Sequence, residues 1–343
     1  MSSPHHTLHR QRGLTLIELM IALVLGLLVV LGVISVVVAN SQAYRTNEGL
    51  SQVQEAARTG FEVLARRIRE AGTTGCGNER IANTVNDVAA WWQIDDWESE
   101  PWPVIRGYDG NTAGPVAFGD DDSDVNQRVP GTGALLLQGL DDIGVFVVDH
   151  NPPSAQFEIN VATPLIDDGD VLLVCDFDHA AIFQVTNYNS TNRTVVHNTG
   201  TGTPGNCSKG LGFPTDCEDT NGNAYSYGEN SMIFRLAMEA WYIGFNGRPA
   251  EGGRSLFRQR LGLNGTTVVE EMVAGVTDMQ LAFREENDAS FAATPGNWNN
   301  VNAVELTLTV ASTDARVSVN TAVDQGRIAR DFTTVVALRN RLP

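Results

Sequence analysis

The feature that most constrains this chain is an apolar run near its N-terminus, residues 19–39, which reads LMIALVLGLLVVLGVISVVVA. The run has 21 residues, carries no charge and is interrupted by one polar side chain, Ser35. At about 1.5 Å of rise per residue it would form about 30 Å of helix, which matches the hydrocarbon core of a bilayer. The sequence therefore predicts a helix that spans a membrane once.

The residues before the run indicate its orientation. Residues 1–17 include Arg10, Arg12 and three histidines, and they contain no acidic residue. Because basic residues stay on the cytoplasmic side, we expect a cytoplasmic N-terminus and place residues 40–343 outside the inner membrane. A secretory signal peptide is the alternative, but the run is longer than the usual apolar region of such a peptide, and no small-residue cleavage site follows it.

Glu18 stands at the cytoplasmic edge of the apolar run. A carboxylate in or near lipid costs free energy, so its presence there indicates a function. The alternative is an ordinary boundary side chain that reaches the headgroup layer.

The segment around this glutamate, residues 12–19, reads RGLTLIEL. It resembles the class III signal of type IV prepilins, which has a glycine, then usually Phe-Thr-Leu-Ile-Glu, then a long apolar helix. The resemblance implies that prepilin peptidase cleaves after Gly13, that the new N-terminus at Leu14 is methylated, and that the helix is retained. Leu14 departs from the commoner Phe, at a position that varies among prepilins. Glu18 would then pair with the N-terminal amine of a neighbouring subunit in the fibre core and so set the register of assembly.

The charge of the chain argues against a general role in binding nucleic acids. The net charge is −18, and cleavage after Gly13 would remove Arg10 and Arg12 but no acid, which gives −20 for the mature chain. So acidic a protein repels the phosphates of DNA and RNA over most of its surface. Hydrophobic residues make up 42% of the chain, which excludes wholesale disorder and indicates a folded head outside the membrane.

The helical pattern continues past the membrane as an amphipathic stripe. Apolar residues recur three or four positions apart at Leu50, Val53, Ala57, Phe61, Leu64 and Ile68. Gly72 follows the last turn, as is typical of a helix C-terminus. The pattern predicts one helix over residues 14–71, about 87 Å long, with a membrane and fibre-core half at 14–40 and an amphipathic half that extends to residue 72. A coiled-coil dimer is the alternative, but about three heptads are short for one.

The rest of the chain, residues 73–343, is expected to form a globular β-rich head. Short β-like runs separated by Gly, Pro, Asn and Asp predict strands over residues 134–140, 144–148, 170–175, 180–186, 194–197, 232–245, 255–261, 276–284, 304–311 and 332–338. Residues 91–128 and 198–230 are expected to be surface loops. The predicted fold class is α+β and pilin-like, with the long helix packed on one antiparallel sheet.

Beyond the signal, the chain resembles the PilW family of minor pilins. The resemblance rests on patches in chain order, among them residues 64–72 (LARRIREAG), 169–176 (GDVLLVCD), 181–186 (AIFQVT), 241–243 (WYI), 273–280 (VAGVTDMQ) and 332–340 (FTTVVALRN). It implies a low-abundance subunit that primes assembly of a type IV pilus and lies near its tip. The implied partners are other minor pilins, the major pilin, a tip adhesin of the PilY type, prepilin peptidase and the inner-membrane assembly platform.

The four cysteines fit an exported head, because an oxidising compartment permits disulfides. Cys207 and Cys217 bracket a short loop and can meet easily, which would leave Cys76 to pair with Cys175 and staple the helix to the head. Three connectivities are possible from the sequence. A zinc site is the rival interpretation, but no Cys-x-x-Cys spacing occurs.

Catalytic and metal-binding roles find little support. Cys175 and His179, with Asp176 or Asp178, could suggest a thiol nucleophile, yet a disulfide and a polar strand end explain these residues more simply. Two acidic segments resemble calcium loops only loosely, because they lack the glycine and distal glutamate of an EF-hand; they are Asp120, Asp121, Asp122 and Asp124, and Asp219, Asn221 and Asn223. We expect no enzyme activity, no cofactor and no metal.

Four of the six tryptophans, Trp91, Trp92, Trp97 and Trp102, fall in one acidic segment. One interpretation is local packing of a long loop onto the head. The other is a contact surface for another minor pilin or the tip adhesin, because tryptophans are enriched at the centres of protein interfaces.

Together these observations predict a non-enzymatic assembly protein. It would be a single-pass protein of the inner membrane that enters the pilus after processing and supports twitching motility and adhesion. A J-type pseudopilin of a type II secretion system is the alternative in the same structural class. A membrane-anchored protein that binds a surface is the alternative from another class.

Overall fold

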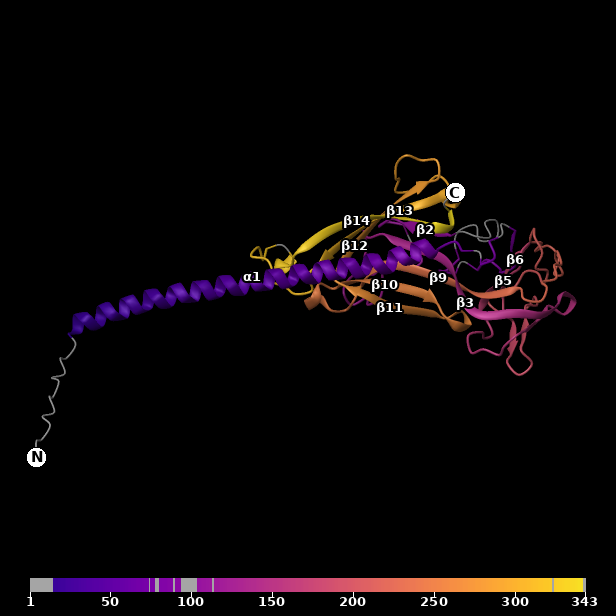
Figure 1. Ribbon diagram of the computed structural model, residues 1–343, viewed down its shortest axis with the longest axis horizontal. Helices are drawn as coiled ribbons and strands as arrows, with labels where there is room; N and C mark the ends of the chain where they lie inside the picture. Colours follow the sequence, from indigo (N-terminus) through magenta and orange to yellow (C-terminus); the bar gives the residue numbers. More distant parts are fainter. Residues whose placement is uncertain are drawn as a thin grey trace, which may run out of the picture.

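The computed structural model describes residues 15–73, 75–77, 80–88, 90–93, 104–112, 114–322 and 324–341. Its dominant element is the helix α1 (Leu16–Glu70), which projects from the head over the first half of its length and lies along the head over the second half (Figure 1). The N-terminal end of α1 and the strands β5 and β6 therefore mark opposite ends of the molecule.

The two ends of α1 follow from local sequence. Thr15 is the N-cap residue, and its hydroxyl accepts a hydrogen bond from the backbone N–H of Glu18. At the other end, Ala71 N–H donates to the carbonyl of Arg67 at 3.0 Å, and Gly72 takes a φ of +76°, which favours glycine. The helix thus lies within the range predicted from the sequence, and Leu14 lies outside the described residues.

Among the described residues the strands form two sheets. The larger sheet has the order β1-β6-β5-β9-β3-β4-β8-β7, with β10 and β11 continuing from β9 and with β2 on β3. Its strands are β1 (Ile81–Asn83), β2 (Ile105–Tyr108), β3 (Ala134–Asn151), β4 (Gln156–Ile159), β5 (Val171–Cys175), β6 (Ala180–Gln184), β7 (Asn187–Asn189), β8 (Thr194–Val196), β9 (Met232–Phe245), β10 (Arg254–Leu261) and β11 (Thr267–Ala274). The smaller sheet has the order β12-β13-β14, with β12 (Val276–Glu285), β13 (Val301–Ala311) and β14 (Ala329–Ala337). Short 3₁₀ helices lie at Pro152–Ser154, Pro249–Glu251, Leu263–Gly265, Trp298–Asn300, Asp324–Gly326 and Arg339–Arg341.

The α+β prediction is confirmed, since a long helix packs on a mostly antiparallel head. The prediction of one sheet is wrong, because the chain changes sheets at Gly275. This glycine has a φ of +79° between β11 and β12, and its carbonyl accepts from Ala311 N–H of the smaller sheet at 2.8 Å. The pairing of β1 with β6 is parallel, whereas the other named strand pairs are antiparallel.

The strand predictions differ from the structure in two further respects. The runs at 134–140 and 144–148 form the single strand β3, which bulges opposite β9 between Asp142 and Val145. The strands β1, β2, β4, β7 and β11 are additional, and β2 lies inside the segment 91–128 that was expected to be a loop. Residues 198–230 contain no strand in the structure, as expected.

The core divides into two clusters. The first is built by the docked half of α1 and by both sheets, with Leu64, Ile68, Trp241, Leu256 and Leu308 among its members. The second lies in the part of the head built from β4, β5, β6, β8 and the end of β3, far from the projecting half of α1. The helix therefore holds the two sheets together on one side of the head, and the second cluster supports the opposite end.

Candidate functional site

The projecting half of α1 is the first candidate site, because no described part of the chain covers it. Every large apolar side chain from Leu16 to Val38 is between 52% and 76% exposed. An uncovered apolar helix of this length needs either lipid or other helices around it. Within the described residues, α1 is the helix that is long and apolar enough to cross a membrane.

The start of this half is organised by Thr15 and Glu18. The Glu18 carboxylate accepts hydrogen bonds from Thr15 N–H at 2.9 Å and from the Thr15 hydroxyl at 3.0 Å. Together with the bond from Glu18 N–H to the same hydroxyl, this forms a capping box. The carboxylate is thereby held beside the first turn, next to the position where cleavage after Gly13 would create a new amine. Gly13 and Leu14 themselves lie outside the described residues.

The other half of α1 is fixed to the head by small residues. Gly49, Ala57 and Gly60 are buried on the face that meets the head. A side chain at Gly49 would collide with Val317, and one at Gly60 would press on Leu308. Close approach of helix and sheet therefore depends on the small residues of this stripe.

A partly buried ion cluster joins the last turn of α1 to the larger sheet. Arg67 contacts Glu239 of β9 at 3.1 Å, and Arg258 of β10 contacts the same carboxylate at 3.2 Å. Trp241 Nε1 also donates to Glu239 at 3.1 Å. Burial raises the pKa of Glu239, while the two arginines and the indole act in the opposite direction. This cluster ties three elements together at the end of the helix.

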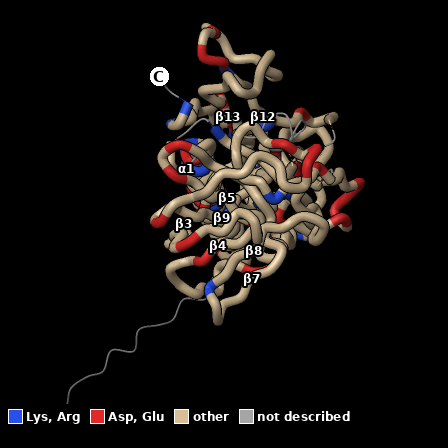
Figure 2. Tube along the Cα trace, turned by 90° about the vertical axis from the view of Figure 1, so that its right-hand side faces the viewer, with Lys and Arg blue, Asp and Glu red and all other residues tan. Residues whose placement is uncertain are grey.

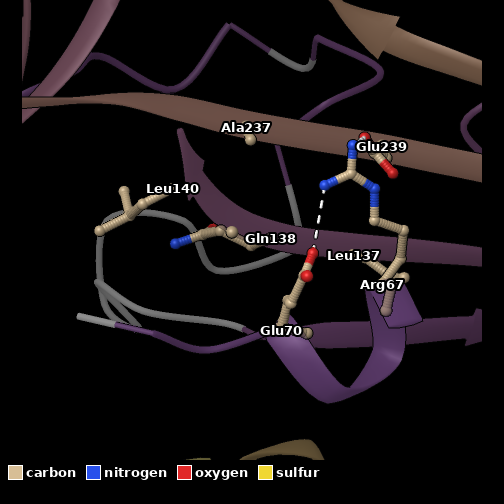
Figure 3. Close-up of a pocket in the computed structure, with 9 residues that line it drawn as sticks. Arg67, Glu70, Leu137, Gln138, Leu140, Ala237 and Glu239 are labelled. Atoms are coloured by element: carbon tan, nitrogen blue, oxygen red, sulfur yellow. Dashed lines mark hydrogen bonds and ion pairs between the residues drawn. The ribbon is translucent and has the colours of Figure 1, made fainter. Parts of the chain in front are cut away.

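Figure 3 shows the hollow beside this cluster, with Arg67 reaching from α1 towards Glu239 and with Gln138 of β3 on the floor. Arg67 also pairs with Glu70 of α1 at 3.3 Å, and Glu70 lines the same hollow. Both amide atoms of Gln138 are buried and have no hydrogen-bond partner in the described part of the chain. The hollow between α1 and these strands therefore combines charged and amide groups with an apolar lining.

This cluster was not predicted from the sequence, although the sequence contains one signal for it. Glu239 is the one acid in the mostly apolar strand β9, MIFRLAMEAWYIGF, whose other charged residue is Arg235. A charge in the middle of such a strand requires a partner when buried. The identity of its partners could not be read from the sequence, because Arg67 is more than 170 positions away.

The four cysteines form two disulfides, and no described cysteine is free. Cys76 is joined to Cys175 of β5, and Cys207 is joined to Cys217. This is the pairing that the sequence analysis favoured. The first bridge connects the segment after α1 to the centre of the larger sheet, and it removes Cys175 as a thiol nucleophile.

The tryptophan segment divides into a described and an undescribed part. Trp92 is 4% exposed and belongs to the first core cluster, so it does not contribute to a contact surface. Trp91 packs partly against the same cluster, and its Nε1 donates to Thr267 of β11 at 2.9 Å. Trp97 and Trp102 lie outside the described residues.

The acidic segments form hydrogen-bonded turns. Asp121 accepts from Ser123 N–H at 2.8 Å, Asp124 accepts from Asp120 N–H at 2.7 Å, and Asp219 accepts from Asn221 N–H at 2.8 Å. Over the described residues no group of three or more His, Cys, Asp and Glu side chains is placed to hold a metal ion. Seen from the end opposite the projecting helix, acidic segments lie on the peripheral loops of the head (Figure 2).

Residues 8–38 match the prokaryotic N-terminal methylation motif. A comparison of the chain with curated proteins finds no match. The motif covers the basic flank, Gly13, Glu18 and most of the apolar run, and it supports a type IV pilin-like protein, that is, a pilin or a pseudopilin. It implies processing by prepilin peptidase and assembly with other pilins, and it points to a structural protein anchored by a single membrane-spanning helix.

Proposed function

We propose that this chain is a minor pilin of the PilW family that primes assembly of a type IV pilus and lies near its tip. The observation that carries the proposal is the division of α1. The half that includes the methylation motif is uncovered, and the other half is fixed to a large head. A subunit built in this way can insert its apolar half among other helices while its head contacts neighbouring heads.

The patches that resemble the PilW family support the finer assignment. Residues 169–176 include β5, residues 181–186 include most of β6, and residues 241–243 lie on β9. These three strands are neighbours in the larger sheet. The resemblance therefore coincides with the centre of the head and with Cys175, which anchors the longer disulfide.

The proposed mechanism has three steps. Before assembly, the basic flank stays in the cytoplasm and the head stands on the outer face of the inner membrane. Cleavage after Gly13 then exposes an amine at Leu14, which is methylated. In the fibre core, Glu18 pairs with the amine of a neighbouring subunit. Because an unpaired charge in that apolar core costs free energy, each subunit stops where its Glu18 is paired, and the pairing sets the register between subunits.

The head would provide the contacts that a few subunits use to start the fibre. The partners we propose are other minor pilins, the major pilin below, and a tip adhesin of the PilY type. Trp97 and Trp102 remain candidates for this contact, together with the exposed part of Trp91.

Deletion of the gene tests the proposal, with complementation by the full chain as the control. We expect loss of surface pili and of twitching motility, while secretion of exoproteins continues. The opposite pattern would assign the chain to a type II secretion system as a J-type pseudopilin.

Mass spectrometry of the N-terminus separates both assembly roles from the plain membrane anchor. We expect the mature chain to begin with methylated Leu14. An uncleaved N-terminus, with normal pili and normal secretion in the deletion strain, would leave the membrane-anchored surface-binding protein as the function.

A further inference from the structure

A charged hollow lies at the foot of the head, beside the point where α1 leaves its apolar run. It is lined by Tyr44, Arg45 and Glu48 of α1 and by residues 314–317 of the β13–β14 loop. Its volume is about 330 Å³, which is at the small end of the range for ligand pockets.

The position of this hollow relative to the membrane follows from helix geometry. Arg45 lies six residues after Ala39, the end of the apolar run, which corresponds to about 9 Å along the helix. The polar headgroup layer adds roughly 5–8 Å on each side of the hydrocarbon core. When residues 19–39 span the bilayer, the hollow therefore lies at the outer edge of the headgroup layer, within reach of the long Arg45 side chain. Tyr44 is a residue type that is enriched at this level.

The hollow has fixed walls. Gln42 Nε2 and Thr46 Oγ1 each donate to the Val317 carbonyl at 2.8 Å, which fixes the β13–β14 loop to α1. Val317 is 3% exposed and packs where Gly49 leaves room for it. The loop is held at its other side by Arg316 N–H, which donates to the Gln325 carbonyl at 2.9 Å.

The charges in the hollow are balanced, but its two cations are not paired. Arg45 and Arg316 are exposed, and neither side chain makes an ion pair or a hydrogen bond within the described residues. Arg316 has a φ of +59°, a conformation that costs free energy for an arginine and that concentrates at functional positions. Opposite them stand Glu48, whose carboxylate raises the pKa of the neighbouring Tyr44 hydroxyl, and Asp314, which accepts from Gln52 at 3.3 Å. Each carboxylate keeps further acceptor sites.

We propose that this hollow binds the zwitterionic headgroup of a phosphatidylethanolamine molecule. The phosphate would contact the guanidinium groups of Arg45 and Arg316, which match phosphate geometry. The primary ammonium, with three N–H donors, would contact Glu48 and Asp314. The inference rests on the proposed membrane topology, and it adds a lipid contact that holds the foot of the head against the membrane before the subunit leaves for the fibre.

The test is lipid binding to the full chain in detergent micelles, measured by native mass spectrometry. The probes are dioleoylphosphatidylethanolamine, dioleoylphosphatidylcholine, dioleoylphosphatidylglycerol and inorganic phosphate. We expect phosphatidylethanolamine to bind about tenfold more tightly than phosphatidylcholine, because a quaternary ammonium cannot donate hydrogen bonds to the two carboxylates.

Three variants locate the site. Arg45→Gln and Arg316→Asn should each weaken phosphatidylethanolamine binding about tenfold, and Asn is chosen because it tolerates the left-handed backbone at position 316. Arg58→Gln is the matched control, because Arg58 is also an exposed arginine of α1 but lies outside the hollow, and it should leave binding unchanged. Thermal unfolding curves verify that each variant is folded.

Equal affinity for phosphatidylethanolamine and phosphatidylcholine would overturn the inference, as would a loss in Arg58→Gln equal to that in Arg316→Asn. Tighter binding of phosphatidylglycerol would also overturn it in favour of an anionic lipid, and competition by inorganic phosphate alone would overturn it in favour of a free anion. If the chain is processed after Gly13 and enters pili but shows no lipid preference, the lipid site fails and the proposed function stands. A chain that is neither processed nor assembled would refute the proposed function instead.

Discussion

At Glu18 one carboxylate serves a local and a proposed intermolecular purpose. Within the chain it accepts from Thr15 N–H at 2.9 Å and closes the capping box. In the proposed fibre it would also compensate the amine of the next subunit. The two purposes can be separated, because glutamine at this helix position can still close a capping box but carries no charge.

In the Glu18→Gln variant, α1 should therefore stay intact and the chain should be cleaved normally after Gly13. The variant should enter pili at least about tenfold less than the unchanged chain, since breaking a buried charge pair costs about 3–5 kcal/mol. The measurement is an immunoblot of sheared pili against the membrane fraction, with N-terminal mass spectrometry for cleavage. Glu55→Gln, an exposed glutamate of the same helix outside the apolar half, is the control. Normal incorporation of Glu18→Gln would show that the charge does not set the register.

Two buried histidines should make the head sensitive to acid. His150 and His197 lie in an aromatic cluster with Phe157, with a centroid distance of 4.1 Å between His150 and Phe157 and of 5.0 Å between His197 and Phe157. His150 Nε2 and both ring nitrogens of His197 are buried and lack hydrogen-bond partners in the described part of the chain. Desolvation lowers the pKa of His150 to about 4, although the charge of Asp149 acts in the opposite direction. Desolvation also lowers the pKa of His197 to about 3, and the neighbouring His150 and Lys209 lower it further.

In the unfolded state both histidines take up protons near pH 6.5, whereas in the folded state they stay neutral at that pH. The stability that the neutral histidines permit is therefore fully present above pH 6.5. It is lost as the pH falls from 6.5 towards 4 and 3, by about 2 kcal/mol per histidine at pH 5. Urea unfolding of the full chain in detergent between pH 7.5 and 5 checks this. His197→Phe should flatten the dependence by about half, and an unchanged slope in this variant would contradict the assignment.

The residues that could be predicted from sequence are those whose signal is local. Gly13, Leu14 and Glu18 fall in one short motif next to the apolar run, so no knowledge of the fold was needed to select them. The pairing of Arg67 with Glu239, and the meeting of Arg45 with Arg316 around one hollow, depend on how a distant strand or loop packs on α1. Such partners become visible only when the docking of the helix is known.

At the scale of elements, strands were predictable where an apolar run is both long and continuous. Residues 232–245 were predicted as a strand and form β9 with the same bounds. The strand β11 was missed because Glu270 and Glu271 interrupt its apolar pattern, and these acids pair with Arg258 and Arg248 across the surface. The split predicted within β3 arose from its Asp-Asp-Ile-Gly segment, which forms a bulge with Gly144 at a φ of +67° instead of a turn.

The two disulfides should differ in their effect because they close loops of different length. Cys76 and Cys175 are 99 positions apart, whereas Cys207 and Cys217 are 10 apart. By loop-closure entropy, replacing the first pair with serine should cost about 4.7 kcal/mol of the free energy of unfolding, and replacing the second about 3 kcal/mol. Urea unfolding of the full chain in detergent measures both. The outcome that contradicts this reasoning is a larger loss for the Cys207/Cys217 variant.

At the scale of the whole molecule, the helix α1 combines an exposed apolar half with a half that packs on the head. The apolar half adds no buried contact to the head, since its large side chains from Leu16 to Val38 are at least 52% exposed. The docked half begins to contact the head at Gln42 and contributes Val53, Leu64 and Ile68 to the core. The head should therefore depend on the helix only from about residue 41 onward.

A chain that begins at Ser41 should fold as a soluble monomer without detergent, because it keeps every described helix residue that touches the head while removing the uncovered apolar surface. In matched detergent, its free energy of unfolding should lie within about 1 kcal/mol of that of the full chain, since residues 15–40, the described part of what is removed, are all exposed. A chain that begins at Phe61 is the control. It lacks Val53 and Ala57, which are 0% and 3% exposed, and the hydrogen bonds of Gln42 and Thr46, so it should lose several kcal/mol. Size-exclusion chromatography and urea unfolding measure both fragments, and a fragment from Ser41 that aggregates or unfolds would show that the apolar half takes part in folding the head.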